Sequence, residues 1–222
     1  MPQRIALIHA TPVAMPPVTA AFCQGWPEVE TMNLLDDALS TDLARRDTLD
    51  ATLRRRIAAL AEYAMQIGVD GILFTCSAFG AAIEAVARTA PIPVLKPNEA
   101  MFEDALRAGT TVGLLATFQP SIPSMEQEFV AMARALGKRA KLEAAWVPDA
   151  MEALTAGDAD AHDRLIAATA PRLDHCDVVL LAQFSMARAL PRVRQAIGHK
   201  VLTSPDSAVV KLKALLSNGA GT

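Results

Sequence analysis

Four short turns carry most of the side chains in this chain that can do chemistry. They read His9-Ala-Thr11-Pro12, Thr75-Cys76-Ser77-Ala78, Ala116-Thr117-Phe118-Gln119-Pro120-Ser121 and Ala182-Gln183-Phe184-Ser185-Met186. Each turn follows an apolar run of the kind that forms a buried parallel strand. Strand carboxyl ends and helix amino ends meet where open α/β sheets bind ligands, so these hydroxyls and free amides can hold a carboxylate. Any one Ser or Thr can instead be a helix N-cap, but four turns sharing the pattern favour a site.

Cys76 is the strongest candidate for a catalytic group. It stands between a strand end and a helix expected over residues 78–88. Unsatisfied amides and the helix dipole at that position favour a thiolate, and so a pKa below the usual value of about 8.5. The alternative is a buried structural cysteine. Cys23 and Cys176 fall within or at the end of expected helices and are expected to be structural.

The histidines are weaker candidates. His9 ends the first apolar run and can serve as a second acid or base, because its ordinary pKa lies near neutrality; a histidine satisfied by the backbone is an equal alternative. His162, His175 and His199 stand in polar sequence and are expected at the surface. The three cysteines lack metal-like spacing, and no dinucleotide, nucleotide or zinc motif is present, so neither metal nor cofactor is expected.

A repeat positions the turns. Residues 70–76, Asp-Gly-Ile-Leu-Phe-Thr-Cys, and 177–183, Asp-Val-Val-Leu-Leu-Ala-Gln, align at an offset of 107 residues, which sets Cys76 opposite Gln183. The same offset aligns residues 5–8 with 112–115 and residues 93–95 with 200–202. The sequence therefore predicts a duplicated unit, with two similar α/β/α lobes related by pseudo-twofold symmetry and an active site in the cleft between them.

The elements follow from the alternation of apolar runs with amphipathic stretches, which is typical of a parallel sheet. Strands are expected near residues 4–9, 29–34, 71–75, 92–95, 111–116, 142–147, 178–182 and 200–203. Long helices are expected over 49–67, 121–136 and 205–216, the last packing back on the first lobe. The first lobe is then residues 1–97 plus 204–222, and the second is residues 98–203.

Composition limits the partners. The chain has 222 residues, 52% of them hydrophobic, and a formal net charge of −3, enough for a large core. Basic residues are scattered among acidic ones, so nucleic acid is not an expected partner. No apolar run is long enough for a signal peptide or a membrane span, and an odd number of cysteines suits reduced thiols in the cytoplasm. The sequence leaves open whether the chain forms a homo-oligomer.

Together these motifs resemble the aspartate/glutamate/hydantoin racemase superfamily over nearly the whole chain. The matching segments are residues 70–79 and 177–187, with support from Val112-Gly-Leu-Leu-Ala-Thr117 and Val201-Leu-Thr-Ser-Pro-Asp206. The resemblance implies two lobes that each offer one cysteine to a cleft, without metal or pyridoxal cofactor. It implies proton transfer next to the carboxylate or carbonyl of a small carboxylate or hydantoin-like substrate.

The chain departs from the family at Gln183, where the second cysteine is expected. An amide cannot relay a proton, but it can donate a hydrogen bond to an oxygen that gains charge. The resemblance then implies Cys76 and Gln183 as catalytic residues. The expected substrate-binding residues are His9, Thr11, Ser77, Ala78, Thr117, Ser121, Phe184 and Ser185.

Several reactions stay open. A racemase-like isomerase with another group as second acid is the leading interpretation. One-face proton exchange by Cys76, a one-cysteine decarboxylase, a cis–trans isomerase of a small dicarboxylate acting through a Cys76 adduct, and a non-catalytic anion-binding protein are the alternatives.

Overall fold

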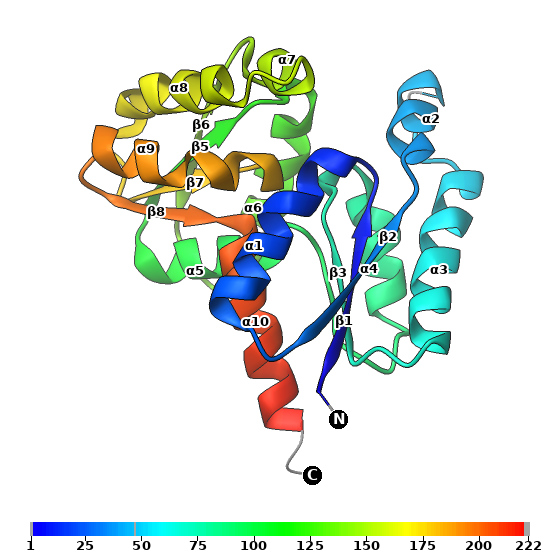
Figure 1. The fold of residues 1–222 in the computed structure, drawn as a ribbon. Helices are drawn as coiled ribbons and strands as arrows, with labels where there is room; N and C mark the ends of the chain where they lie inside the picture. The colour runs from blue at the N-terminus through cyan, green and yellow to red at the C-terminus, as the bar shows by residue number, and fades with distance from the viewer. Residues whose placement is uncertain (1, 47, 220–222) are drawn as a thin grey trace. The chain divides into compact units, whose positions relative to one another are not determined.

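The computed structural model describes residues 2–46 and 48–219 (Figure 1). The chain divides into two compact units, Met1–Pro97 with Ala208–Thr222, and Asn98–Ser207. The outer ends of the expected first lobe, residues 1 and 220–222, lie outside the described residues.

The first unit is built on a four-stranded parallel sheet in the order β2-β1-β3-β4. Its strands are β1 (Arg4–His9), β2 (Glu30–Leu35), β3 (Gly71–Phe74) and β4 (Val94–Leu95). Its helices are α1 (Met15–Gly25), α2 (Ala38–Arg46), α3 (Ala51–Gln66), α4 (Gly80–Ala87) and most of α10 (Ser204–Gly219), with 3₁₀ turns η1 (Pro12–Ala14) and η2 (Ser77–Phe79). Helices α3 and α4 cover one side of the sheet, and α1 and α10 cover the other (Figure 1).

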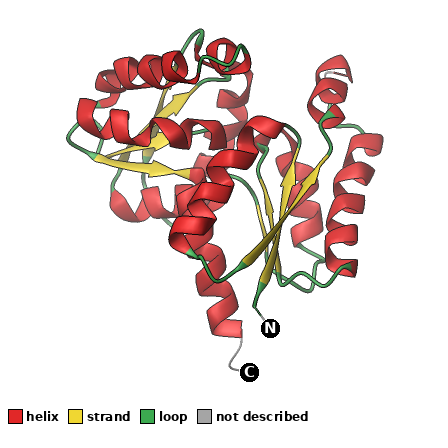
Figure 2. Ribbon diagram, viewed as in Figure 1, coloured by secondary structure: helices red, strands yellow, loops and turns green. Residues whose placement is uncertain are grey.

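The second unit repeats this plan, with a parallel sheet in the order β6-β5-β7-β8. Its strands are β5 (Thr111–Ala116), β6 (Lys141–Trp146), β7 (Val178–Leu181) and β8 (Lys200–Thr203). Its helices are α5 (Glu99–Ala108), α6 (Ile122–Ala135), α7 (Ala150–Thr155), α8 (Ala159–Thr169) and α9 (Leu190–Ala196), with 3₁₀ segments η3 (Gln119–Ser121), η4 (Ala170–Leu173) and η5 (Phe184–Ala189). Figure 2 shows helices on both faces of each sheet, which confirms the predicted α/β class.

The central strands explain why their sequences are almost wholly apolar. All four residues of β3 and all four of β7 are buried, because helices cover both faces of each sheet. Helix α3 instead alternates: Leu53, Ile57, Ala61 and Ala64 are buried at three- and four-residue steps. Each fully buried Leu or Ile contributes about 1.5–3 kcal/mol relative to an exposed one. The periodicity therefore places helices and strands with little ambiguity.

Most element ends shift by one to three residues from the expected ones, and two of these shifts have a clear structural reason. The strand expected over 92–95 shortens to β4, because Pro93 has no N–H to donate and contributes only its carbonyl oxygen, which accepts from Ile72 at 2.9 Å. The helix expected from residue 78 begins at Gly80, because Ser77–Phe79 forms the tighter turn η2. Helices α3 and α6 stop before Gly68 and Gly137, whose φ angles of 77° and 63° suit glycine.

The repeat extends to a side chain at the amino edge of each sheet. One carboxylate oxygen of Asp70 accepts the backbone N–H of Arg4 at 2.7 Å. Its counterpart Asp177 accepts the backbone N–H groups of Thr110 and Thr111 at 2.7 and 2.8 Å. In both units, therefore, an aspartate preceding the third strand joins it to the start of the first.

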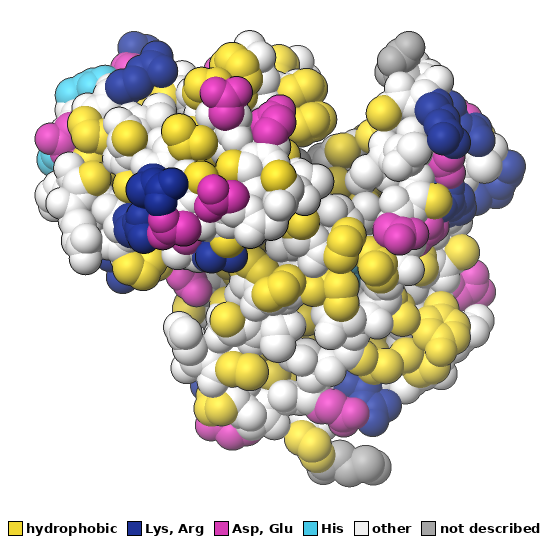
Figure 3. Space-filling view, turned by 45° about the horizontal axis from the view of Figure 1, so that its top comes forward, with side chains coloured by type: hydrophobic (Ala, Val, Ile, Leu, Met, Phe, Trp, Pro, Cys, Tyr) yellow, Lys and Arg dark blue, Asp and Glu magenta, His cyan; other side chains and the backbone are white. Residues whose placement is uncertain are grey.

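The surface carries both charge signs. On the face drawn in Figure 3, Lys and Arg side chains are interspersed with Asp and Glu. Within residues 2–46 and 48–219, no helix combines the length and apolarity needed to cross a membrane.

Candidate functional site

Cys76 follows β3 by two residues and continues its extended backbone, with φ −121° and ψ 119°. The next residue begins η2, so the side chain sits at the carboxyl edge of the first sheet, as the sequence predicts. The thiol is half-buried, whereas Cys23 is exposed and Cys176 buried. Among the three cysteines, only Cys76 combines a strand-end position with partial access.

The predicted thiolate character of Cys76 is wrong. Burial raises the pKa of the Cys76 thiol above its ordinary value, although the Ala78 backbone N–H and the Ser40 hydroxyl oppose that shift. Desolvation is the largest cause, and the segment directly after Cys76 is a 3₁₀ turn instead of the expected α-helix. Desolvation therefore outweighs the few dipoles that stabilise negative charge, and the thiol is protonated at neutral pH.

His9 is fully buried, and protein groups occupy both of its ring nitrogens. Nε2 lies 2.8 Å from Asn33 Oδ1, and Nδ1 lies 2.9 Å from Thr75 Oγ1. Because an amide oxygen only accepts, Nε2 carries the proton. Nδ1 is then an acceptor, and the single Thr75 hydroxyl hydrogen is shared between it and the Ile8 carbonyl, which lies 3.3 Å from Thr75 Oγ1. Burial lowers the pKa of His9, so the ring is neutral, and it joins the ends of β1, β2 and β3.

In the second unit, Gln183 occupies the position equivalent to Cys76 and is held at both ends of its amide. Its Oε1 accepts the backbone N–H of Thr117 at 2.9 Å and the Thr117 hydroxyl at 3.3 Å. Its Nε2 donates to Ser121 Oγ at 3.1 Å, and that hydroxyl donates to the Phe118 carbonyl at 2.7 Å. A backbone N–H can only donate, so the amide orientation is determined by this contact.

This network makes Gln183 a fixed donor. Thr117 and Ser121 are buried, while Gln183 is half-buried. Nε2 has two N–H groups, of which Ser121 accepts one; the other has no acceptor among residues 2–46 and 48–219 and can donate to a ligand. Three of the predicted site residues, Thr117, Ser121 and Gln183, thus meet at the carboxyl edge of the second sheet, where β5 and β7 are hydrogen-bonded neighbours.

The other predicted binding residues fall into two groups. Thr11 and Ser77 are half-buried, and neither hydroxyl has a hydrogen-bond partner among the residues that the structure describes. Ala78 is exposed, and Phe184 and Ser185 are buried in η5 directly after Gln183. All five follow a strand end, but only Thr11, Ser77 and Ala78 present accessible atoms.

Sequence reasoning missed Ser40, which contacts Cys76 from helix α2. Its hydroxyl donates to the Ala10 carbonyl at 3.0 Å. The sequence did hold a signal for Ser40. It follows shortly after the end of β2 at Leu35, and residues that follow a strand lie at the carboxyl edge of the sheet, where Cys76 also lies.

The expected surface position of His162 is also wrong. The ring is fully buried, its Nδ1 lies 2.7 Å from Asp163 Oδ1, and its Nε2 has no partner among the described residues. Arg188 Nε donates to the two oxygens of the same carboxylate at 2.9 and 3.1 Å. Helix α8 packs against η5, so polar sequence around His162 did not make it exposed. The side chains of His175 and His199 are 56% and 42% exposed, as predicted.

A groove of about 600 Å³ lies elsewhere in the second unit, at the end of α6 and the start of β6. Its lining includes Arg134, Lys138, Arg139 and Lys141, and none of the predicted site residues. This groove lies at the amino edge of the sheet, whereas the side chains at the strand carboxyl ends carry the candidate chemistry.

Comparisons with known proteins agree with the fold. The family model of the Asp/Glu/Hydantoin racemases matches residues 15–212. No curated protein sequence gives a significant match. Many solved structures share the fold.

Three of these structures span a range of activities. A glutamate racemase isoform from Bacillus anthracis has a TM-score of 0.72 at 13% identity, covering 98% of this chain and 82% of that one. An allantoin racemase from Pseudomonas fluorescens has a TM-score of 0.70 at 18% identity, with coverage of 98% and 92%. A glycine-to-cysteine mutant of arylmalonate decarboxylase, in its sulfate-associated form, has a TM-score of 0.67 at 16% identity, with coverage of 99% and 94%. At these identities the likeness is one of fold.

Proposed function

Because the chain belongs to the Asp/Glu/hydantoin racemase family, we propose that it is a cofactor-independent enzyme that transfers a proton at the carbon next to a carboxylate or carbonyl group, with Cys76 as the acid–base group. The observation that carries the proposal is the position of Cys76: a half-buried thiol at the carboxyl edge of a parallel sheet, beside the Ala78 N–H and the Ser40 hydroxyl. The Ala78 N–H can donate to the thiolate that forms when the proton leaves, and the Ser40 hydroxyl can do so by turning away from the Ala10 carbonyl, to which it donates at 3.0 Å.

Gln183 supports the proposal as the donor to a substrate oxygen. Removing a proton, or carbon dioxide, next to a carboxylate moves an electron pair onto the carboxylate oxygens. The free N–H of Gln183 meets such an oxygen without reorganising, because Thr117 and Ser121 already hold the amide. We assign Thr11, Ser77, Ala78 and the backbone around Ser185 to the remaining contacts with a small carboxylate or hydantoin-like substrate.

A racemase-type reaction with this set needs a second acid. His9 is not suited to that role, because it is buried with both ring nitrogens engaged. Ser185 is buried, and a hydroxyl of ordinary acidity is a weak proton donor. Reaction on one face, at Cys76, is therefore the form that the side chains support best.

One observation favours a second candidate, decarboxylation of a malonate-like acid. The raised pKa keeps the Cys76 thiol protonated, which suits a donor better than a base. In that reaction the bond to carbon dioxide breaks, its electron pair enters an enediolate, and the thiol proton passes to carbon. Water then reprotonates the thiolate. The arylmalonate decarboxylase that shares the fold supports this candidate.

The test pairs two assays on the tag-free protein. Glutamate, aspartate, allantoin and a 5-substituted hydantoin are incubated in deuterated water, with exchange followed by mass spectrometry and enantiomers by chiral chromatography. Arylmalonates are assayed for carbon dioxide release. We expect α-proton exchange or decarboxylation without efficient formation of the opposite enantiomer.

Matched variants test which side chains carry the reaction. Cys76→Ser should lose activity by about 10²- to 10⁴-fold, as expected for loss of a general acid–base group, while Cys23→Ser should not change it. Gln183→Cys supplies a second thiol at the equivalent position and should gain measurable racemisation. Full activity in Cys76→Ser would overturn the proposal, and efficient racemisation by the unmodified protein would overturn its one-face form.

A further inference from the structure

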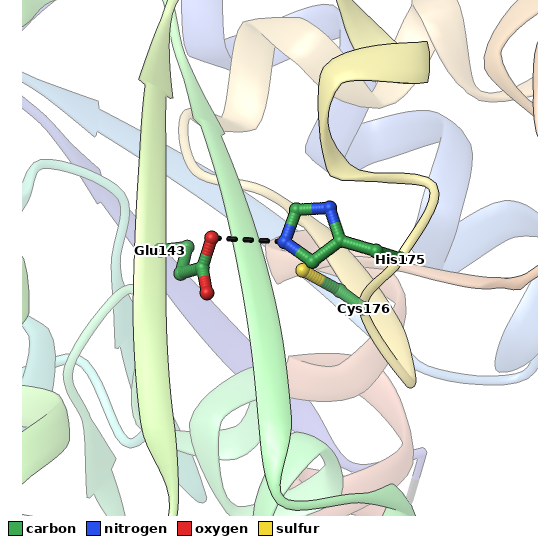
Figure 4. Close-up of side chains that lie close together, drawn as sticks. All are labelled: Glu143, His175 and Cys176. Atoms are coloured by element: carbon green, nitrogen blue, oxygen red, sulfur yellow. Dashed lines mark hydrogen bonds and ion pairs between the residues drawn. The ribbon is translucent and has the colours of Figure 1, made fainter.

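A second cluster of reactive side chains lies at the opposite edge of the second sheet. Glu143 projects from β6, and His175 and Cys176 stand in the segment before β7. Their side chains point toward one another in Figure 4, and one carboxylate oxygen, one ring nitrogen and the sulfur all lie within 4.8 Å of each other. Within the described residues, it is the one group of this kind.

The cluster lies over the middle one of three neighbouring strands. Strand β5 lies between β6 and β7, and its Gly113 pairs with Glu143 on one side and Val179 on the other. A Cβ atom built at Gly113 would lie 3.0 Å from Leu173 and 3.3 Å from Cys176 Sγ. The glycine thus leaves room for the thiol above the middle strand. An ion held here would tie β6 to the approach to β7.

The donor set matches a divalent ion of borderline softness. Carboxylate, imidazole and thiolate are the three ligand types that zinc combines, and a three-ligand site leaves a fourth position for water. Ligand atoms around one tetrahedral zinc ion are roughly 3.3–3.6 Å apart. The observed spread of up to 4.8 Å therefore requires the side chains to converge by about an ångström. His175, which is exposed, has the freedom to do so.

The contacts present around the cluster are compatible with this change. His175 Nε2 lies 2.9 Å from Glu143 Oε2, so the ion would replace one hydrogen bond with two coordinate bonds. Lys141 Nζ lies 2.8 Å from the other oxygen, Oε1, and would remain as an outer partner of the ligating carboxylate. The ion displaces the Cys176 proton to solvent, since a coordinating thiol is deprotonated.

We propose that Glu143, His175 and Cys176 form a binding site for a single zinc-type divalent ion that clips β6 to the segment before β7. The ion is a stabilising or regulatory ligand rather than a reactant, because the site is separated from Gln183 by the length of β7. The proposal departs from the sequence-based expectation of no metal, and it is independent of the proton-transfer function.

The experiment uses tag-free, chelator-treated protein titrated with Co²⁺ alone and then competed with Zn²⁺. We expect one ion per chain, with a thiolate-to-cobalt charge-transfer band and visible d–d absorption that Zn²⁺ abolishes. Zn²⁺ should also raise the melting temperature of the wild-type protein. Mg²⁺ and Ca²⁺, which prefer oxygen ligands, should neither abolish the cobalt absorption nor raise the melting temperature.

Variants decide whether these three residues hold the ion. His175→Gln and Glu143→Gln should each weaken binding more than about tenfold, since even outer-shell losses cost that much. Cys176→Ser should lose the charge-transfer band. Because Cys176 is buried and its variant can fail to fold, His175→Gln on the exposed side provides the independent check.

The controls are Cys23→Ser, Cys76→Ser and His199→Gln, all of which should bind as the wild type does. Binding that survives in His175→Gln, a charge-transfer band that disappears in Cys23→Ser or Cys76→Ser, or no stoichiometric binding at all would overturn the proposal.

Discussion

Cys76 and Gln183 occupy equivalent turns, yet their surroundings suit them to different tasks. The thiol is desolvated and faces two weak donors, so it keeps its proton. The amide is held by a backbone N–H and two hydroxyls, so it keeps its orientation. A proton donor that remains protonated and a hydrogen-bond donor that does not rotate are both useful when charge develops on a substrate oxygen.

The state of the Cys76 thiol can be tested by alkylation. Because burial raises its pKa, Cys76 should react with iodoacetamide more slowly than the exposed Cys23 at neutral pH, and its rate should keep rising as the pH passes 9.0. Mass spectrometry of the labelled peptides measures each rate. Faster labelling of Cys76 than of Cys23 at neutral pH would contradict a protonated thiol.

His162 makes stability depend on pH. Burial lowers its pKa below 6.5, so the unfolded chain binds a proton more readily than the folded one. This contribution to the free energy of unfolding is complete above pH 6.5 and is lost as the pH falls through the folded pKa. His9, whose pKa burial also lowers, acts in the same direction.

His162→Gln keeps a donor for Asp163 but cannot be protonated. Urea unfolding between neutral and mildly acidic pH should therefore show a shallower loss of stability in this variant than in the wild type. His199→Gln, at an exposed position, should keep the wild-type slope. If the free energy of unfolding falls equally with pH in the wild type and both variants, His162 is excluded as a cause of the loss of stability in acid.

At the scale of elements, each sheet is secured at its amino edge by an aspartate. Hydrogen bonds from Thr111 and Thr110 hold the pKa of Asp177 below its usual value, so its carboxylate is charged wherever the protein is folded at ordinary pH. Gly109 makes room for that carboxylate. Its φ of −170° is open to any residue, so packing, and not the backbone, requires glycine there.

Gly109→Ala should therefore destabilise the protein. The added Cβ would lie 2.3 Å from Asp177 Cβ and 2.6 Å from its Oδ2, which forces the carboxylate away from β5. Overpacking of this kind costs about 1–3 kcal/mol in the free energy of unfolding. Gly80→Ala is the matched control, because a Cβ there meets nothing within 4 Å. Equal urea midpoints for the two variants would show that Asp177 can shift without loss.

At the scale of the whole molecule, the net charge is small, and four basic side chains gather around the groove in the second unit: Arg134, Lys138, Arg139 and Lys141. The formal net charge is −3, and acidic and basic side chains alternate on the face drawn in Figure 3. Affinity for nucleic acid depends on neutralising several phosphates with clustered Lys and Arg. The mixed charge on that face predicts no binding of nucleic acid, and the basic groove is the surface on which this prediction can fail.

Fluorescence anisotropy with labelled duplex DNA checks this expectation. At micromolar protein and roughly 0.15 M salt, the anisotropy should not change. A salt-sensitive complex would indicate that the basic groove around Arg134 and Lys138 binds polyanions.

The sequence by itself determined the two α/β sheets and the strand ends that carry Cys76, Thr117 and Gln183. Runs such as Gly71–Phe74 and Val178–Leu181 are apolar because both faces of a parallel strand are buried. Consecutive residues of the sequence are therefore enough to identify these strands. The repeat preserves the register between the first and third strands and between the third and fourth strands of the two sheets. Local pattern was therefore sufficient for the elements and for the equivalence of Cys76 and Gln183.

Only the tertiary structure decided the chemical state of these side chains. Thr117 and Ser121 hold Gln183 across 66 and 62 residues of chain, and Asn33 and Thr75 engage His9 across 24 and 66. Protonation depends on desolvation and on which donor lies within about 3 Å, and both depend on segments brought together by folding. For the same reason the sequence-based reading expected a thiolate at Cys76 and an exposed His162, whereas burial gives a protonated thiol and a neutral, enclosed ring.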